Sequence, residues 1–139
     1  MDLLSLLNEN ARLTNAQLAV MLGKTEEEVE KEIADYQQKG IIKGYKALIN
    51  WEKVDHHKTT ALIELKVQPK KESGFDEIAK KIMQFSKVES VYLMSGGFDL
   101  AVMVHGDSIQ DIAMFVAKRL SPLDSVLSTA THFILTRYK

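Results

Sequence analysis

The sequence predicts an α+β protein with a helical N-terminal part and a C-terminal part in which strands and helices alternate. Three observations support this fold class. Apolar residues recur every three or four positions up to about residue 40, which is typical of helices. From about residue 58, segments in which every second residue is apolar, typical of strands, alternate with segments in which apolar residues recur every three or four positions, typical of helices. The 139 residues, 45% of them hydrophobic, suffice for one ordinary domain or two small ones.

The first two predicted helices lie in residues 1–23. Leu3 and Leu7 belong to an apolar stripe at helical spacing, and the pattern breaks after residue 9. Thr14 is then well placed to cap a second helix, because Gln17 follows three residues later and completes a capping box. Gly23 suits the end of that helix, since glycine readily adopts the left-handed conformation found there.

A third helix is predicted to follow directly and to end at Gly40. Thr25 and Glu28 repeat the capping box, and Val29 and Ile33 have the spacing of a buried face. Two capped helices joined across a glycine, with another helix before them, are typical of a helix-turn-helix.

Residues 41–50, "IIKGYKALIN", alternate in polarity and predict a strand or small wing. The N-terminal domain is therefore expected to be a winged helix-turn-helix over residues 1–49. Residues 50–58, "NWEKVDHHK", are polar and contain neither glycine nor proline, so we expect a short ordered connector. The second domain would cover residues 59–139.

The C-terminal domain is predicted to have the order β-α-β-β-α-β of a ferredoxin-like fold. The expected segments are a strand at 59–67, a helix at 74–85, a hairpin at 88–106, a helix at 107–120 and a strand at 125–138. Its helices would cover only one face of the sheet. The other face would expose apolar side chains, which we expect to meet a second copy of the chain. These are Leu62, Tyr92, Met94, Met103 and Phe133.

Composition argues against several classes of protein. The formal net charge is −1, there is no cysteine, and no apolar run is long enough to span a membrane. The N-terminus lacks the features of a signal peptide, so a cytoplasmic location is expected. The four histidines do not form a metal-binding motif, and no catalytic or nucleotide-binding fingerprint is present. We therefore expect no cofactor, no metal and no enzymatic activity.

Several motifs together resemble one family of regulators. They are "RLTNAQLA", "GKT" and "KGIIKGYKALIN" in the N-terminal half, and "SGGFD" (residues 95–99) with the T-x-T of Thr129 and Thr131 in the C-terminal half. In this order and separation they resemble the Lrp/AsnC (feast/famine) transcriptional regulators. The resemblance implies DNA binding, homodimers built through C-terminal domains of the RAM type, octamers or larger assemblies, and amino-acid effectors bound between those domains.

The resemblance also implies an effector-binding set, namely Ser95, Gly96, Gly97, Asp99, Thr129 and Thr131. The chemistry suits an amino acid, because backbone N–H groups of a glycine-rich turn can bind a carboxylate and a carboxylate side chain can bind an ammonium group. The alternative is structural: the glycines permit the turn and the aspartate caps it. From the residues alone the structural interpretation is favoured, and the resemblance reverses that preference.

The third helix is unexpectedly acidic for a helix that enters DNA. From Glu26 to Gln38 it has six acidic residues and one lysine, a net charge of −5, and residues 1–50 have eight acidic and six basic residues, a net charge of −2. DNA affinity depends mainly on neutralising phosphates. The expected DNA-binding set is Arg12, Thr14, Asn15, Lys24, Thr25, Glu26, Glu27, Lys31 and Lys43. The alternative hypothesis is an amino-acid-binding interaction module whose helix-turn-helix has lost or changed its DNA target.

Overall fold

The computed structural model describes residues 1–56, 58–70, 72 and 74–139. The chain divides into two compact units, Met1–Ile49 and Asn50–Lys139, and each is described by itself. The first unit is helical, and the second contains a four-stranded antiparallel sheet, so the fold class is α+β.

Three helices form the N-terminal unit. They are α1 (Leu3–Glu9), α2 (Asn15–Leu22) and α3 (Glu26–Gln38). Both predicted capping boxes are confirmed. The Thr14 hydroxyl accepts from the Gln17 N–H at 3.1 Å while the Gln17 side chain accepts from the Thr14 N–H at 2.9 Å. Thr25 and Glu28 exchange the same pair of hydrogen bonds at the start of α3. Gly23 ends α2 with φ of +65°, in the left-handed region.

The core of this unit is small and entirely apolar. Leu18 and Val29 are both fully buried, one on α2 and one on α3, and so hold the two helices together. The other buried members are Leu3, Leu6, Leu7 and Ala19. Tyr36 and Ile42 pack at its margin, which brings the end of α3 and the residues after it against the core.

The predicted strand or wing over residues 41–50 is not a strand in the structure. This prediction was wrong because a strand requires a hydrogen-bonding partner, and no strand is present in residues 1–49 to pair with it. Apart from Ile42, the apolar residues of this segment remain exposed, Leu48 with 80% of its surface accessible. The three helices are therefore present in the order of a helix-turn-helix, but without the wing.

The C-terminal unit begins with a single 3₁₀ turn, η1 (Trp51–Lys53), whose start is capped by the Asn50 side chain. This turn lies in the predicted connector, of which His57 lies outside the described residues. The order β-α-β-β-α-β follows. Its elements are β1 (Thr59–Val67), α4 (Gly74–Met83), β2 (Val88–Leu93), β3 (Leu100–Gly106), α5 (Ile109–Phe115), its wider continuation η2 (Val116–Leu120) and β4 (Val126–Phe133).

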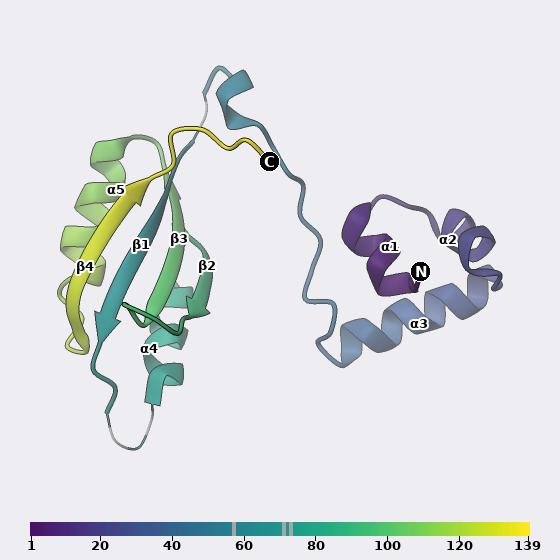
Figure 1. Cartoon of the computed structure of the whole chain (residues 1–139), viewed down its shortest axis with the longest axis horizontal. Helices are drawn as coiled ribbons and strands as arrows, with labels where there is room; N and C mark the ends of the chain where they lie inside the picture. Colours follow the sequence, from purple (N-terminus) through teal and green to yellow (C-terminus); the bar gives the residue numbers. More distant parts are fainter. Residues whose placement is uncertain (57, 71, 73) are drawn as a thin grey trace. The chain divides into compact units, whose positions relative to one another are not determined.

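The strands lie in the order β2-β3-β1-β4, and every neighbouring pair is antiparallel. Helices α4 and α5 both lie on one face of the sheet (Figure 1). Alternate residues of β1 point to that face and are buried, as the sequence pattern predicts. These are Ala61, Ile63, Leu65 and Val67.

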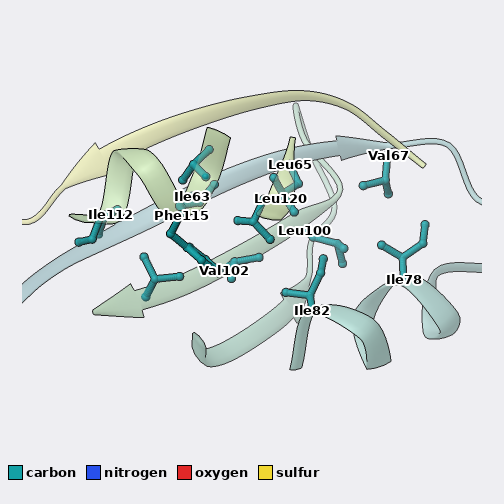
Figure 2. Close-up of a cluster of buried hydrophobic side chains, with 13 residues drawn as sticks. Ile63, Leu65, Val67, Ile78, Ile82, Leu100, Val102, Ile112, Phe115 and Leu120 are labelled. Atoms are coloured by element: carbon teal, nitrogen blue, oxygen red, sulfur yellow. The ribbon is translucent and has the colours of Figure 1, made fainter. Parts of the chain in front are cut away.

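Figure 2 shows how the two helices close the core over the sheet. Ile78 and Ile82 of α4 and Phe115 of α5 lie against Leu100 and Val102 of the sheet and their neighbours. The rings of Phe85 and Phe115 meet edge to face, with centroids 5.4 Å apart. Burial of these side chains away from water is the main stabilising contribution to this unit.

The opposite face of the sheet is open in the single chain. Leu62 and Met103 are paired across β1 and β3 and are half-buried, and Tyr92 is exposed. Phe133 was wrongly expected on this face: it pairs with the buried Ala61 and packs against the core on the helix side. Among the described residues, no helix is long and apolar enough to cross a membrane.

Candidate functional site

The loop between β2 and β3 holds the predicted glycine-rich motif and is fixed at its base by Asp99. The Asp99 carbonyl accepts a hydrogen bond from the Met94 N–H at 2.8 Å, which closes the loop. The Asp99 N–H donates to the Leu65 carbonyl at 3.0 Å, and its carboxylate Oδ2 accepts from the Val67 N–H at 2.9 Å. The loop is therefore longer than a tight glycine turn, and Asp99 anchors it to β1.

The tip of the loop presents backbone to solvent. Ser95, Gly96 and Gly97 are all exposed. Gly96 has φ of +135°, a conformation that other residues rarely adopt, whereas Gly97 does not have a positive φ. A Cβ atom added at either glycine would meet no atom within 4 Å. The backbone groups at this tip are thus open to a ligand or to another chain.

The threonine pair lies on the other side of β1 from the loop. Thr129 pairs with Leu65 and Thr131 with Ile63, so both threonines share the helix-covered side of the sheet and are half-buried. Because the Asp99 N–H binds the Leu65 carbonyl, the loop base and Thr129 flank the same residue of β1. Strands β3 and β4 are two ladder spacings apart, roughly 9–10 Å. One chain brings the two groups to the same end of the sheet but not into contact.

A separate hollow of about 200 Å³ lies between the start of α4 and the loop that precedes β4. It contains none of the predicted effector residues. Lys81 and Glu77 in its wall are 3.8 Å apart, and Lys70 and Asp124 add one further charge of each sign. Among the described residues of its wall, positive and negative charges are therefore balanced.

In the N-terminal unit, Lys24 is held by the third helix. Its Nζ lies 2.6 Å from Oε2 of Glu32, and the Tyr36 hydroxyl donates to Oε1 of the same carboxylate at 3.1 Å. The hydrogen bond to Glu32 raises the pKa of the Lys24 ammonium above its ordinary value. The same carboxylate raises the pKa of the Tyr36 hydroxyl, because the hydrogen bond favours the protonated phenol.

Two further lysines are paired along α3. Lys31 lies 3.4 Å from Glu27 and Lys39 lies 2.8 Å from Asp35, each one helical turn apart. The Asp35 carboxylate raises the pKa of Lys39 by accepting its hydrogen bond. When Lys24 and Lys39 are included, residues 24–39 contain six acidic residues and three lysines. The net charge of this stretch is −3, compared with −5 for Glu26–Gln38 alone.

The acidic residues also lie mainly to either side of the line of α3 that is opposite the core, and not on it. At 100° per residue, the positions opposite the buried Val29 are Glu27, Lys31, Ala34 and Gln38, and all four are exposed. The one acid and the one base on this line form an ion pair. This line of α3 is therefore neutral overall.

The remaining predicted DNA contacts are exposed, but some are already used by the fold. The hydroxyls of Thr14 and Thr25 accept helix-capping hydrogen bonds. Asn15 begins α2, and Arg12 precedes it in the α1–α2 turn. Within the part of the chain that the structure describes, the side chains of Arg12 and Lys43 form no ion pair.

Sequence reasoning missed three contacts that shape these two regions. The bond from Val67 to Asp99, the ion pair of Lys24 with Glu32, and the Tyr36 hydroxyl on the same carboxylate all depend on the fold. Among the described residues, no cluster of histidine, aspartate and glutamate has the arrangement of a metal site.

Comparison with known proteins agrees with this architecture. The family profile described as the Lrp/AsnC ligand binding domain matches residues 60–139. A solved structure, the transcriptional regulator NMB0573 of Neisseria meningitidis in complex with L-Met, superposes with a TM-score of 0.73 at 22% identity. That alignment covers 96% of this chain and 86% of the other, and at this identity it supports the fold alone.

Two curated relatives cover nearly the whole chain. The HTH-type transcriptional regulator YugG of Bacillus subtilis, itself described as uncharacterized, is 48% identical over 99% of this chain and 84% of its own length. The HTH-type transcriptional regulator LrpA of Pyrococcus abyssi is 28% identical over 99% of this chain and 94% of its own length. Both are named as regulators of transcription and neither as an enzyme. The chain therefore belongs to the Lrp/AsnC family of helix-turn-helix transcriptional regulators.

Proposed function

We propose that this regulator binds double-stranded DNA through α2 and α3 and changes its binding when an amino acid occupies the C-terminal unit. The observation that carries the DNA-binding half is the neutral exposed line of α3, which supports entry into a groove despite the acidic composition. Helices α2 and α3 would act as the helix-turn-helix, with Gly23 allowing the sharp turn between them. With this role we also propose a cytoplasmic location.

The proposed DNA contacts are the predicted ones, with different tasks. Arg12 and Lys43 are exposed without an ion pair among the described residues, so they are the best suited to bind phosphates. Asn15, Glu27 and Lys31 are exposed polar side chains that would face bases or backbone. Thr14, Thr25 and Glu26 complete the set around the two helix starts, together with Lys24 once a phosphate displaces Glu32 from its ammonium. With only two cations of the proposed set, Arg12 and Lys43, outside the ion pairs of the described residues, useful affinity would require several copies on one DNA.

We propose that the effector is an amino acid bound by the loop tip and the threonine pair. Exposed backbone at Ser95, Gly96 and Gly97 suits a carboxylate, and the hydroxyls of Thr129 and Thr131 suit hydrogen bonding to either end of the ligand. One carboxylate oxygen of Asp99 is used by Val67, which leaves the other for an ammonium group. The structure of NMB0573 with L-Met supports this class of ligand.

Because the loop and the threonines flank opposite sides of β1, we propose that each effector site is completed between chains. The loop tip of one chain and the threonines of another would enclose one ligand. The open sheet face with Leu62, Tyr92 and Met103 would form the primary homodimer, and larger assemblies such as an octamer would bring the loops of neighbouring dimers together.

Two experiments test this function. Electrophoretic retardation of a duplex from the promoter of its own gene, at low salt and saturating protein, should give a shifted complex. Thermal unfolding in the presence of each of the twenty amino acids should reveal at least one that raises the melting temperature, because a ligand of the native state stabilises it by mass action. Absence of retardation at every protein concentration would reject the DNA-binding half, and twenty unchanged melting curves would reject the effector.

The second candidate function is an amino-acid-binding interaction module that has lost or changed its DNA target. The net charge of −2 over residues 1–50 favours it. Retention of an amino-acid-induced stabilisation with no retardation of DNA would select this alternative.

A further inference from the structure

The ion pair between Lys24 and Glu32 differs from the other two on α3. Lys31 with Glu27 and Lys39 with Asp35 join residues one turn apart on the same helix. Lys24 instead reaches from the turn before α3 to a carboxylate eight residues away, at 2.6 Å. Its side chain is 40% exposed and that of Glu32 is 27% exposed, whereas both side chains of the Lys31–Glu27 pair are more than 75% exposed.

Glu32 is also fixed from its other side. Its second oxygen accepts the Tyr36 hydroxyl at 3.1 Å, and Tyr36 packs against the core of the unit. A carboxylate held by a core side chain keeps its orientation, so less conformational entropy is lost when it binds Lys24. The Lys24 ammonium is therefore directed at Glu32, while the turn that carries it lies at the entrance of the helix proposed to bind DNA.

We propose that Glu32 is a determinant of DNA affinity that keeps Lys24 from binding phosphate. This proposal rests on the proposed DNA-binding function. In the free protein the ammonium binds Glu32, and a DNA phosphate must displace that carboxylate before Lys24 contributes to binding. Removing the charge of Glu32 frees one cation for each α3 that touches DNA.

The consequence is measurable as salt dependence. Each phosphate contact made by a cation steepens the slope of log affinity against log salt by about 0.9. In the full-length protein, Glu32→Gln should therefore steepen this slope by about 0.9 for each α3 engaged, and tighten binding to the promoter duplex at low salt. Fluorescence anisotropy with that duplex, between about 50 and 200 mM NaCl, gives both the affinity and its dependence on salt.

Three further variants separate this effect from a simple loss of negative charge. Glu30→Gln removes the same charge from the same helix, and Glu30 forms no ion pair among the described residues. It should strengthen binding slightly without changing the slope. The double variant Lys24→Ala/Glu32→Gln should return the slope to that of the wild type. Tyr36→Phe releases one oxygen of Glu32 and should give an intermediate slope, which keeps the test valid if Glu32→Gln folds poorly.

The outcomes distinguish this proposal from the proposed function. If the wild type binds the duplex and the salt slopes of Glu32→Gln and Glu30→Gln are equal, the role of Glu32 is overturned. The proposed DNA binding is then unaffected. If the wild type does not bind the duplex and Glu32→Gln binds it in a salt-dependent manner, the result supports the role of Glu32. If neither protein binds the duplex, both the role of Glu32 and the proposed DNA binding fail, while circular dichroism of each variant reports whether the helices are intact.

Discussion

The carboxylate of Asp99 accepts a hydrogen bond from the backbone N–H of Val67, 2.9 Å away, although 32 positions separate the two residues in sequence. The Asp99 N–H donates to Leu65 just beyond the last pair of the β1–β3 ladder, Leu65 with Leu100. Asp99 thus extends the contact between these strands with one backbone and one side-chain hydrogen bond. The position of the glycine loop depends on this residue before any ligand is bound.

Replacement of Asp99 by alanine should destabilise the C-terminal unit by about 1–3 kcal/mol, because the Val67 N–H loses its acceptor. Asp99→Asn keeps an oxygen at the same place and should cost less. Urea unfolding monitored by circular dichroism measures both. Equal losses for the two variants would mean that the charge matters and the hydrogen bond does not.

Gly96 and Gly97 offer a matched pair of substitutions in the same loop. Gly96→Ala should cost about 1–3 kcal/mol or displace the loop, because φ of +135° is strained for any residue with a Cβ atom. Gly97→Ala should be close to neutral, since a Cβ atom there meets nothing and φ is not positive. Melting temperatures of the two variants provide the comparison. A larger loss at Gly97 would contradict the loop conformation.

Local sequence signals predicted the fold well where neighbours in sequence decide the structure. The capping boxes at Thr14 and Thr25 were confirmed because their hydrogen bonds join residues three positions apart. The buried face of β1 followed from alternation, since a strand with one covered face must bury every second residue. The sheet order agrees with the β-α-β-β-α-β pattern.

Features that depend on distant residues could not be predicted in the same way. The segment 41–50 has the pattern of a strand but no partner in its unit. The hydrogen bond between Val67 and Asp99 forms only because β1 passes beside the loop. The ion pair between Lys24 and Glu32 forms only because the turn before α3 and the middle of that helix lie close together.

Acid should weaken the C-terminal unit partly through Asp111. Lys87, 2.6 Å away, and the backbone N–H of Asp107 hold the pKa of Asp111 below its ordinary value of 3.8. A lowered pKa in the folded state means that the contribution to stability is complete above the unfolded value and is lost as the pH falls through the folded value. Urea midpoints measured below about pH 5 should therefore fall less steeply for Asp111→Asn than for the wild type. Parallel curves would show that the ion pair makes no contribution.

The small N-terminal core should tolerate little loss of volume. Leu18 is fully buried, and Leu18→Ala should cost about 2–5 kcal/mol, enough to unfold this unit. Val20, on the same helix and 84% exposed, is the control, and Val20→Ala should be nearly neutral. Hydrogen exchange resolved by residue tests this directly: amide protection should disappear in residues 1–49 of Leu18→Ala and persist in the sheet. Loss of protection in both units would show that they do not fold independently.

The open face of the sheet gives the last prediction. Tyr92 lies on β2 opposite Ala101, on the side away from the helices, and is 55% exposed. If two chains meet there, Tyr92→Lys places an unpaired charge in an apolar interface, which is strongly unfavourable.

Sedimentation velocity at micromolar concentration should then show the wild type as a dimer or larger species and Tyr92→Lys as a shift toward the monomer. Met83→Lys is the matched control, because Met83 ends α4 on the helix side and is 62% exposed. It introduces the same charge in a similarly exposed place and should leave the assembly unchanged. A monomeric wild type, or an equal shift in both variants, would contradict dimerisation through this face. The proposal of an effector site completed by a neighbouring chain would then fail as well, since it requires such an assembly.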